Sequence, residues 1–228
     1  MLIDHIGLIF FDGVAIFRIL GRIAFPIFAF MIAEGCRYTR HKLRYFLTVF
    51  GMGIAYLAVF YVYSGMVYMS IFITFSLSII MIYALQLFKG FCFENDRSLL
   101  KIILSGAAFV SAVLLAFFVN KIFEVDYGFF GALAPLLVAL CHKPPNCRSE
   151  FFEKIDRLEI SLVGLTVAII GLYLTYGGIR LFALLSIPLL LLYSGKRGKK
   201  NMKYFFYIFY PVHILVLEGI YMLLQIIK

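Results

Sequence analysis

The chain has 228 residues, of which 64% are hydrophobic and 14% charged, and its formal net charge is +9. Soluble domains are about 45–50% apolar and about 25% charged, so this composition excludes a soluble enzyme, a disordered chain and a secreted disulfide scaffold. It also argues against an outer-membrane barrel, whose strands alternate polar and apolar residues. We therefore predict an all-α, polytopic transmembrane helix bundle.

An N-terminal apolar segment, residues 1–11, is too short to cross a bilayer. At 1.5 Å per residue it spans about 16 Å, roughly half of the hydrocarbon core. We predict a half-helix here, and we expect that about ten further apolar residues precede Met1 in the coding sequence, because a crossing needs about 20 residues.

Charge-free stretches and turn residues divide the rest of the chain into candidate spans. The stretch 45–88 contains no Asp, Glu, Lys, Arg or His and is long enough for two crossings. Two later segments contain Pro135 and Pro188 and are short, so we expect them to be kinked, tilted or partly re-entrant. About eight full spans are predicted within a single membrane domain over 1–228: 14–33, 45–63, 67–88, 102–120, 127–141, 160–176, 181–193 and 204–227.

Basic residues orient these spans. Sixteen of the 21 Lys and Arg residues fall in alternate loops, 34–44, 89–101, 142–158 and 194–203. Loops rich in Lys and Arg stay in the cytoplasm, so we predict that these four loops are cytoplasmic. The positive charge is then a topology signal, and we predict no nucleic-acid partner.

The cysteines give no sign of a metal centre. All four lie on or beside the loops predicted to be cytoplasmic, where thiols stay reduced. Cys141, His142 and Cys147 are close in sequence, but their spacing is not that of a standard zinc site. We predict no metal site.

Ionisable residues from three predicted helices fall at a similar depth in the membrane. Measured along the helices, His5, Arg22 and His213 lie about 20, 18 and 15 Å from the cytoplasmic face of a core about 30 Å thick. A charged group at such depth costs about 2.5 kcal/mol or more, so it should face a partner or water. This coincidence favours a polar cavity inside the bilayer.

Structural pairing is the alternative reading. Arg18 and Arg22 lie one helical turn apart and could tie helices together by pairing with Asp4 and Glu218. Neighbouring residues of a helix point about 100° apart, so Asp4 is poorly placed to orient His5. We expect Asp4 to pair with Arg22 across helices.

Two histidines remain as the groups able to move protons near neutral pH. These are His5 and His213. Tyr207 and Tyr210 precede His213 at spacings of three, so the three side chains share roughly one helix face. Ordinary aromatic packing would also explain both tyrosines.

Several blocks of the sequence match a known family. They are Asp4-His5-Ile6-Gly7, Gly21 to Phe30, Ala33-Glu34-Gly35 with Thr39-Arg40, Tyr127 to Gly131, Tyr193 to Gly198, and Lys203 to His213. With these blocks the chain resembles the TraX family nearly end to end. The founding type of that family is the conjugative F-pilin acetylase of the bacterial inner membrane, and the family resembles other multi-span acyltransferases that use acyl-CoA.

The resemblance implies an inner-membrane acyltransferase that moves an acetyl group from acetyl-CoA to an amine or hydroxyl. The implied catalytic residues are His5, Asp4, Arg22 and His213. His5 would be the general base or carry the acetyl group briefly, Arg22 would stabilise the oxyanion or hold a phosphate, and His213 would relay a proton or hold the thioester. The acceptor is a pilin-like peptide, a glycan or another small molecule.

Binding of acetyl-CoA would use cations on the cytoplasmic side, although the orientation rule alone also explains these residues. Glu34 could orient Arg37 or the pantetheine arm. The predicted cofactor contacts are Arg37, Arg40, Lys42, Lys196, Arg197 and Tyr210.

Two other functions remain open. A transporter or exporter could use His5, Arg22 and His213 as an intramembrane proton relay, although no inverted repeat is visible. A non-catalytic membrane partner of a conjugation or pilus apparatus would not need the histidines at all.

Overall fold

The computed structural model describes residues 2–11, 14–93, 98–144, 147, 149–195 and 203–227. The described residues form helices, and an isolated β-bridge joins Met69 to Val125. The prediction of an all-α membrane chain is therefore confirmed. The chain divides into two compact units, 1–27 with 173–228 and 28–172. Each unit is described by itself, and a single domain over 1–228 stays a prediction.

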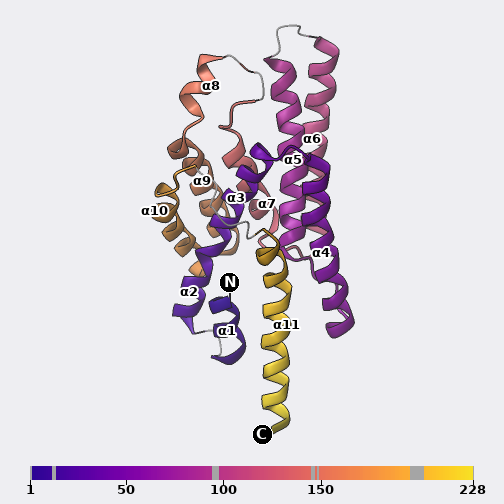
Figure 1. Cartoon of the computed structure of the whole chain (residues 1–228), viewed down its shortest axis with the longest axis vertical. Helices are drawn as coiled ribbons and strands as arrows, with labels where there is room; N and C mark the ends of the chain where they lie inside the picture. Colours follow the sequence, from indigo (N-terminus) through magenta and orange to yellow (C-terminus); the bar gives the residue numbers. More distant parts are fainter. Residues whose placement is uncertain are drawn as a thin grey trace. The chain divides into compact units, whose positions relative to one another are not determined.

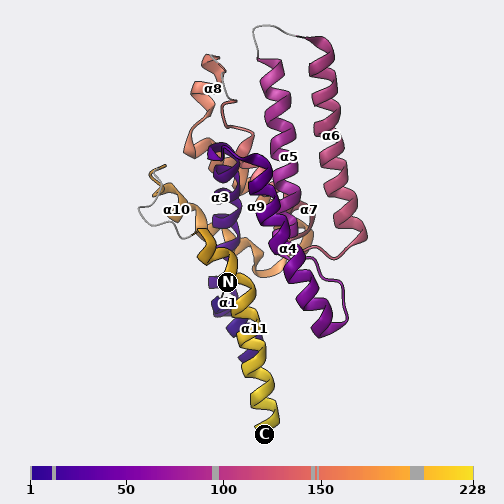
Figure 2. The ribbon, with the colours of Figure 1, turned by 45° about the vertical axis from the view of Figure 1, so that its right-hand side comes forward.

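The larger unit is built around a central helix, α5. This helix is buried along most of its length and packs on α4, α6 and α7. Figures 1 and 2 both show α5 and α6 side by side, with α4 along one end of α5. The helices of this unit, some of which extend beyond it, are α3 (Ala24–Tyr38), α4 (Lys42–Ser64), α5 (Ile71–Cys92), α6 (Leu99–Ile122), α7 (Gly128–Ala139), α8 (Glu150–Ile155) and α9 (Leu158–Tyr176).

Two hydroxyl groups of α5 donate to backbone carbonyls outside this helix. The Ser78 hydroxyl donates to Ala132 O at 2.7 Å, and the Thr74 hydroxyl donates to Asp126 O at 2.6 Å. Because an unpaired hydroxyl is costly away from water, these bonds fix α5 against α7 and the segment before it. Gly164 lets α9 approach α7, since a Cβ at this position would lie 2.6 Å from Leu137 O.

The smaller unit places α1 between two partners. Its elements are α1 (Leu2–Phe10), α2 (Ala15–Arg22), η1 (Gly178–Leu185), α10 (Ser186–Leu191) and α11 (Lys203–Ile227). Helix α1 packs against α2 and α11, and η1 packs against α2; Figures 1 and 2 show α1 beside α11. The first helix is thus the half-length segment that the sequence predicts.

Glycines permit the close contact between α1 and α2. A Cβ at Gly21 would collide with the Cβ of Asp4, and a Cβ at Gly7 would collide with that of Phe17. The two helices can therefore approach only because these positions lack side chains. Both glycines belong to the blocks that carry the family resemblance.

Five helices in the described part of the chain are long and apolar enough to cross a membrane: Ala15–Tyr38, Lys42–Val62, Ile71–Cys92, Leu99–Ile122 and Leu158–Tyr176. The figure of about eight full spans therefore stays a prediction. Segments 127–141 and 181–193 form the shorter apolar helices Gly128–Ala139 and Gly178–Leu191, and the apolar stretch found in α11 is Val212–Leu224. The chain is a multi-pass membrane protein with shorter apolar helices beside its long ones.

Candidate functional site

The two histidines that are predicted to lie within the membrane meet in the smaller unit. His5 Nδ1 lies 3.3 Å from His213 Nε2, and the two rings pack edge to face with centroids 5.1 Å apart. The His213 side chain is buried, and its ring also stacks on Phe209 at 5.0 Å. Residues separated by 208 positions are thus brought together by the packing of α1 on α11.

A backbone carbonyl sets the direction of the hydrogen bonds in this pair. His213 Nδ1 lies 2.7 Å from Phe209 O, and a carbonyl oxygen only accepts, so His213 Nδ1 carries a proton. In a neutral imidazole the other nitrogen is then an acceptor. His5 must therefore donate from Nδ1 to His213 Nε2. The unprotonated nitrogen of a neutral His5 is Nε2, and this nitrogen can take up a proton.

Asp4 pairs with Arg18 instead of Arg22. Arg18 Nε lies 3.2 Å from Asp4 Oδ1, and both side chains are largely buried. The expected pair with Arg22 does not form, because Gly21 brings α2 against Asp4 with Arg18 turned toward the carboxylate. Arg22 makes no ion pair within the described residues, and its Nε is buried without a hydrogen-bond partner. Glu218, the other carboxylate that could pair with these arginines, belongs to α11, and its side chain is not described.

Three of the predicted cofactor contacts, Arg37, Arg40 and Lys42, lie in the larger unit. Arg37 donates from Nη1 and Nη2 to the two carboxylate oxygens of Asp156, each at 2.8 Å. Its Nη1 also lies 3.9 Å from Glu34, the residue expected to orient it. Lys42 lies over the Tyr83 ring at 5.2 Å, and Arg40 is exposed in the turn after α3.

The side chains of the other three predicted contacts are not described. Lys196 and Arg197 lie outside the described residues. Tyr210 belongs to α11, and its side chain is not described.

A buried imidazole at the predicted cytoplasmic end of the larger unit was not expected from the sequence. His142 Nε2 lies 3.5 Å from Glu34 Oε1. Burial lowers the pKa of His142 from 6.5 to about 4, and the nearby Arg37 guanidinium adds to this effect. The ring is therefore neutral at pH 7. His142 Nδ1 is buried and has no hydrogen-bond partner.

From the sequence, Lys89 was expected only to contribute to the positive charge of a cytoplasmic loop. Its ammonium donates to Ala139 O at 3.3 Å and His142 O at 3.2 Å, and also to Leu140 O. A cation at this position satisfies the free carbonyls at the end of α7 and stabilises the negative end of its dipole. No sequence pattern links Lys89 to α7, which lies about 50 residues later.

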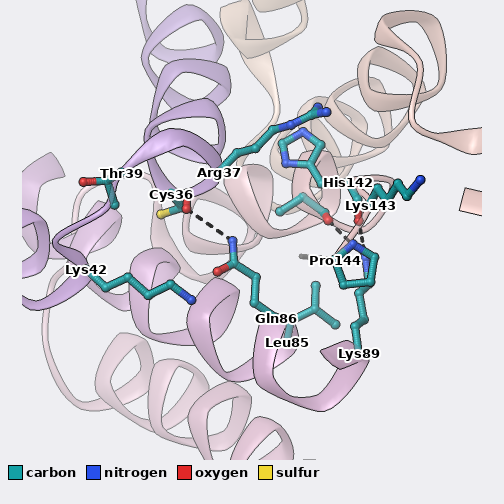
Figure 3. A pocket seen from close by; sticks show the side chains of 11 residues that line it. Cys36, Arg37, Thr39, Lys42, Leu85, Gln86, Lys89, His142, Lys143 and Pro144 are labelled. Atoms are coloured by element: carbon teal, nitrogen blue, oxygen red, sulfur yellow. Dashed lines mark hydrogen bonds between the residues drawn. The ribbon is translucent and has the colours of Figure 1, made fainter. Parts of the chain in front are cut away.

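Arg37, Lys42, Lys89 and His142 are among the residues that surround a cavity of about 130 Å³ in the larger unit. Figure 3 shows its lining, in which Lys42 extends toward Gln86 while Arg37 extends away past His142. Within the described part of the chain, no three His, Cys, Asp or Glu side chains are grouped closely enough to hold a metal ion.

Comparison with known proteins gives one family. The family model described as TraX protein matches residues 1–221. No curated protein and no solved structure matches the chain.

Proposed function

Because the chain belongs to the TraX family, we propose that it transfers an acetyl group from acetyl-CoA to an amine or hydroxyl acceptor at the His5–His213 pair. Acetyl transfer is the activity associated with the family, and a pilin is the acceptor in the founding type. The acceptor of this chain is proposed only by its chemistry, as a nucleophile that must lose a proton.

The observation that carries the proposal is the contact between His5 and His213. An acyltransferase needs a base that removes a proton from the attacking nucleophile, and a base near neutral pH is most often a histidine. The carbonyl of Phe209 fixes the tautomer of His213, and His213 in turn fixes that of His5. His5 Nε2 is therefore already in the form that accepts a proton.

The proposed reaction proceeds by general base catalysis. His5 Nε2 takes the proton of the acceptor's N–H or O–H group, and the acceptor atom forms a bond to the thioester carbon. The carbon–sulfur bond of acetyl-CoA then breaks. The departing thiolate takes the proton back from His5, so the products are the acetylated acceptor and free CoA. While His5 is an imidazolium, its Nδ1–H group stays bonded to His213 Nε2, which stabilises the charge.

Two charged residues of the same unit support this role. The developing oxyanion of the thioester carbon requires a donor or positive charge, and Arg22 has a buried Nε that lacks a hydrogen-bond partner. We assign oxyanion stabilisation to Arg22. Asp4 neutralises Arg18, so the carboxylate acts by limiting the positive charge near His5 and not by orienting its ring.

We propose that cations on the predicted cytoplasmic side bind the acetyl donor. Arg37 is held by Asp156 at both of its terminal nitrogens, so we assign it the weaker role of a fixed positive charge. Contact with the donor phosphates then falls to Arg40, Lys42, Lys196 and Arg197. The proposed location is the bacterial inner membrane, with the basic loops on the cytoplasmic side.

The test measures acetyl transfer by the full chain in membranes supplied with labelled acetyl-CoA. His5→Ala should reduce transfer about 10²–10⁴-fold, the usual contribution of a general base. His41→Ala is the matched control, because His41 is exposed before α4. Equal transfer in both variants would contradict the proposal. A transporter would leave the thioester intact in every sample.

A further inference from the structure

Four cationic side chains line the cavity in the larger unit. Its lining comes from the end of α3, the start of α4, the end of α5 and the segment that follows α7, all predicted to lie at the cytoplasmic face. Figure 3 shows these side chains around one space. The lining residues among those described include no carboxylate and are Cys36, Arg37, Thr39, Lys42, Leu85, Gln86, Lys89, Ala139, His142, Lys143 and Pro144.

Three of the four lining cations are engaged by groups of the protein. Asp156 holds Arg37, Glu153 holds Lys143 at 2.8 Å, and backbone carbonyls hold Lys89. The carboxylates of Asp156 and Glu153 offset the charges of Arg37 and Lys143, and the donor hydrogens of all three cations are largely used.

Lys42 differs from the other three cations. Its ammonium lies over the Tyr83 ring, and among the described residues no carboxylate pairs with it. A cation–π contact stabilises a cation by about 0.5–1 kcal/mol at an exposed site and leaves ammonium hydrogens for another acceptor. Lys42 is therefore the lining cation that can bind a ligand directly.

We propose that this cavity binds a phosphate group presented at the cytoplasmic face, either the headgroup of an anionic phospholipid or the phosphate of a soluble compound. Basic pockets between membrane helices on the cytoplasmic side suit such headgroups. Phosphate oxygens accept hydrogen bonds, and charge-assisted bonds to them are strong. The ammonium of Lys42 and the amide of Gln86 supply the donors, and Thr39 lines the same cavity.

The size of the cavity limits what it can hold. Its volume of about 130 Å³ is below the roughly 300–1,000 Å³ of pockets that enclose whole drug-sized ligands. A phosphate group fits this space, and the rest of the ligand must lie outside it. Gln86 helps to hold the wall in place, since its amide nitrogen donates to Cys36 O at 3.3 Å.

The experiment measures binding to the purified full chain in detergent, with phosphatidylglycerol as the lipid probe and inorganic phosphate as the soluble probe. Lys42→Gln should weaken one of them about tenfold or more, because it removes a charge-assisted hydrogen bond. Lys101→Gln is the matched control, since Lys101 also lies over a ring, that of Phe91 at 5.8 Å, but does not line the cavity.

Each outcome decides the proposal. A loss for phosphatidylglycerol alone identifies a lipid site, and a loss for inorganic phosphate identifies a soluble ligand. If Lys42→Gln does not fold, Gln86→Glu, which keeps the size of the side chain but replaces an amide donor by a carboxylate, should still weaken binding severalfold. Affinities equal to those of Lys101→Gln with both probes would overturn the proposal. Where the soluble ligand is the acetyl donor, the inference rests on the proposed function, which also assigns Lys42 to the donor phosphates. His5→Ala separates the two, because it should reduce acetyl transfer and leave these affinities unchanged.

Discussion

Substituting His213 by two different amides separates the two hydrogen bonds that this ring makes. A glutamine amide reaches the place of Nε2, whereas an asparagine amide reaches the place of Nδ1. His213→Gln can therefore still accept the proton of His5 Nδ1. His213→Asn can donate to Phe209 O but leaves the His5 Nδ1–H group without this acceptor.

The size of the difference follows from the contact that is lost. His5 Nδ1 and His213 Nε2 are 3.3 Å apart; His213 is only 5% exposed, and His5 is half-buried. A donor that loses its acceptor away from water costs about 1–3 kcal/mol. At about 1.4 kcal/mol per factor of ten, we expect kcat/KM for acetyl transfer to be about 5–150-fold lower in His213→Asn than in His213→Gln.

The assay compares kcat/KM and its pH dependence in the two variants with labelled acetyl-CoA. Losing the acceptor of His5 Nδ1 should also change the pH at which the rate of transfer rises. A purely structural role of His213 would leave that pH unchanged. Equal rates and equal pH profiles in the two variants, both folded, would refute the tautomer argument.

Two further predictions concern stability. Gly21→Ala should destabilise the chain by about 1–3 kcal/mol, the usual cost of overpacking, because the new Cβ collides with Asp4; thermal unfolding measures this. His142 has a pKa of about 4 in the folded chain, below its unfolded value of 6.5, so the folded state binds fewer protons between these values. Stability should fall by up to about 3 kcal/mol as the pH drops from 6.5 to 4, and less in His142→Asn.

Each of these predictions has a control. Gly51→Ala adds the same methyl group to a helix at a position with no atom within 4 Å. Alanine favours a helix over glycine by about 1 kcal/mol, so this variant should be neutral or slightly more stable. Equal destabilisation in Gly51→Ala would show that the contact with Asp4 is not the cause. For His142, identical pH curves for the variant and the wild type would contradict the prediction.

The long spans could be predicted because their signal is local. A run of about 20 apolar residues without charges identifies a membrane helix whatever surrounds it. The charge-free stretch 45–88 contains two such runs with a turn between them. The short segments 127–141 and 181–193 could not be resolved this way. Whether such a segment crosses the membrane fully depends on the helices that cover its ends. In the structure both segments form short helices.

The meeting of His5 and His213 was anticipated from depth, since two costly groups at one level of the membrane should share an environment. The preferred partner of Asp4, Arg22, was wrong, and the observed pair with Arg18 belongs to the alternative reading of structural pairing, because depth does not give the rotation of a helix about its axis. That rotation is set by the packing around Gly21. His142 and Lys89 were missed for a similar reason, since their partners come from distant parts of the chain.

The most direct test of acetyl transfer by this chain is mass spectrometry of membrane proteins and glycans. It compares cells that produce the wild-type chain with cells that produce His5→Ala at the same level. We predict at least one component that carries an added acetyl group only with the wild type. An identical set of acetylated components in both samples would contradict the assignment of His5 as the base of an acetyltransferase.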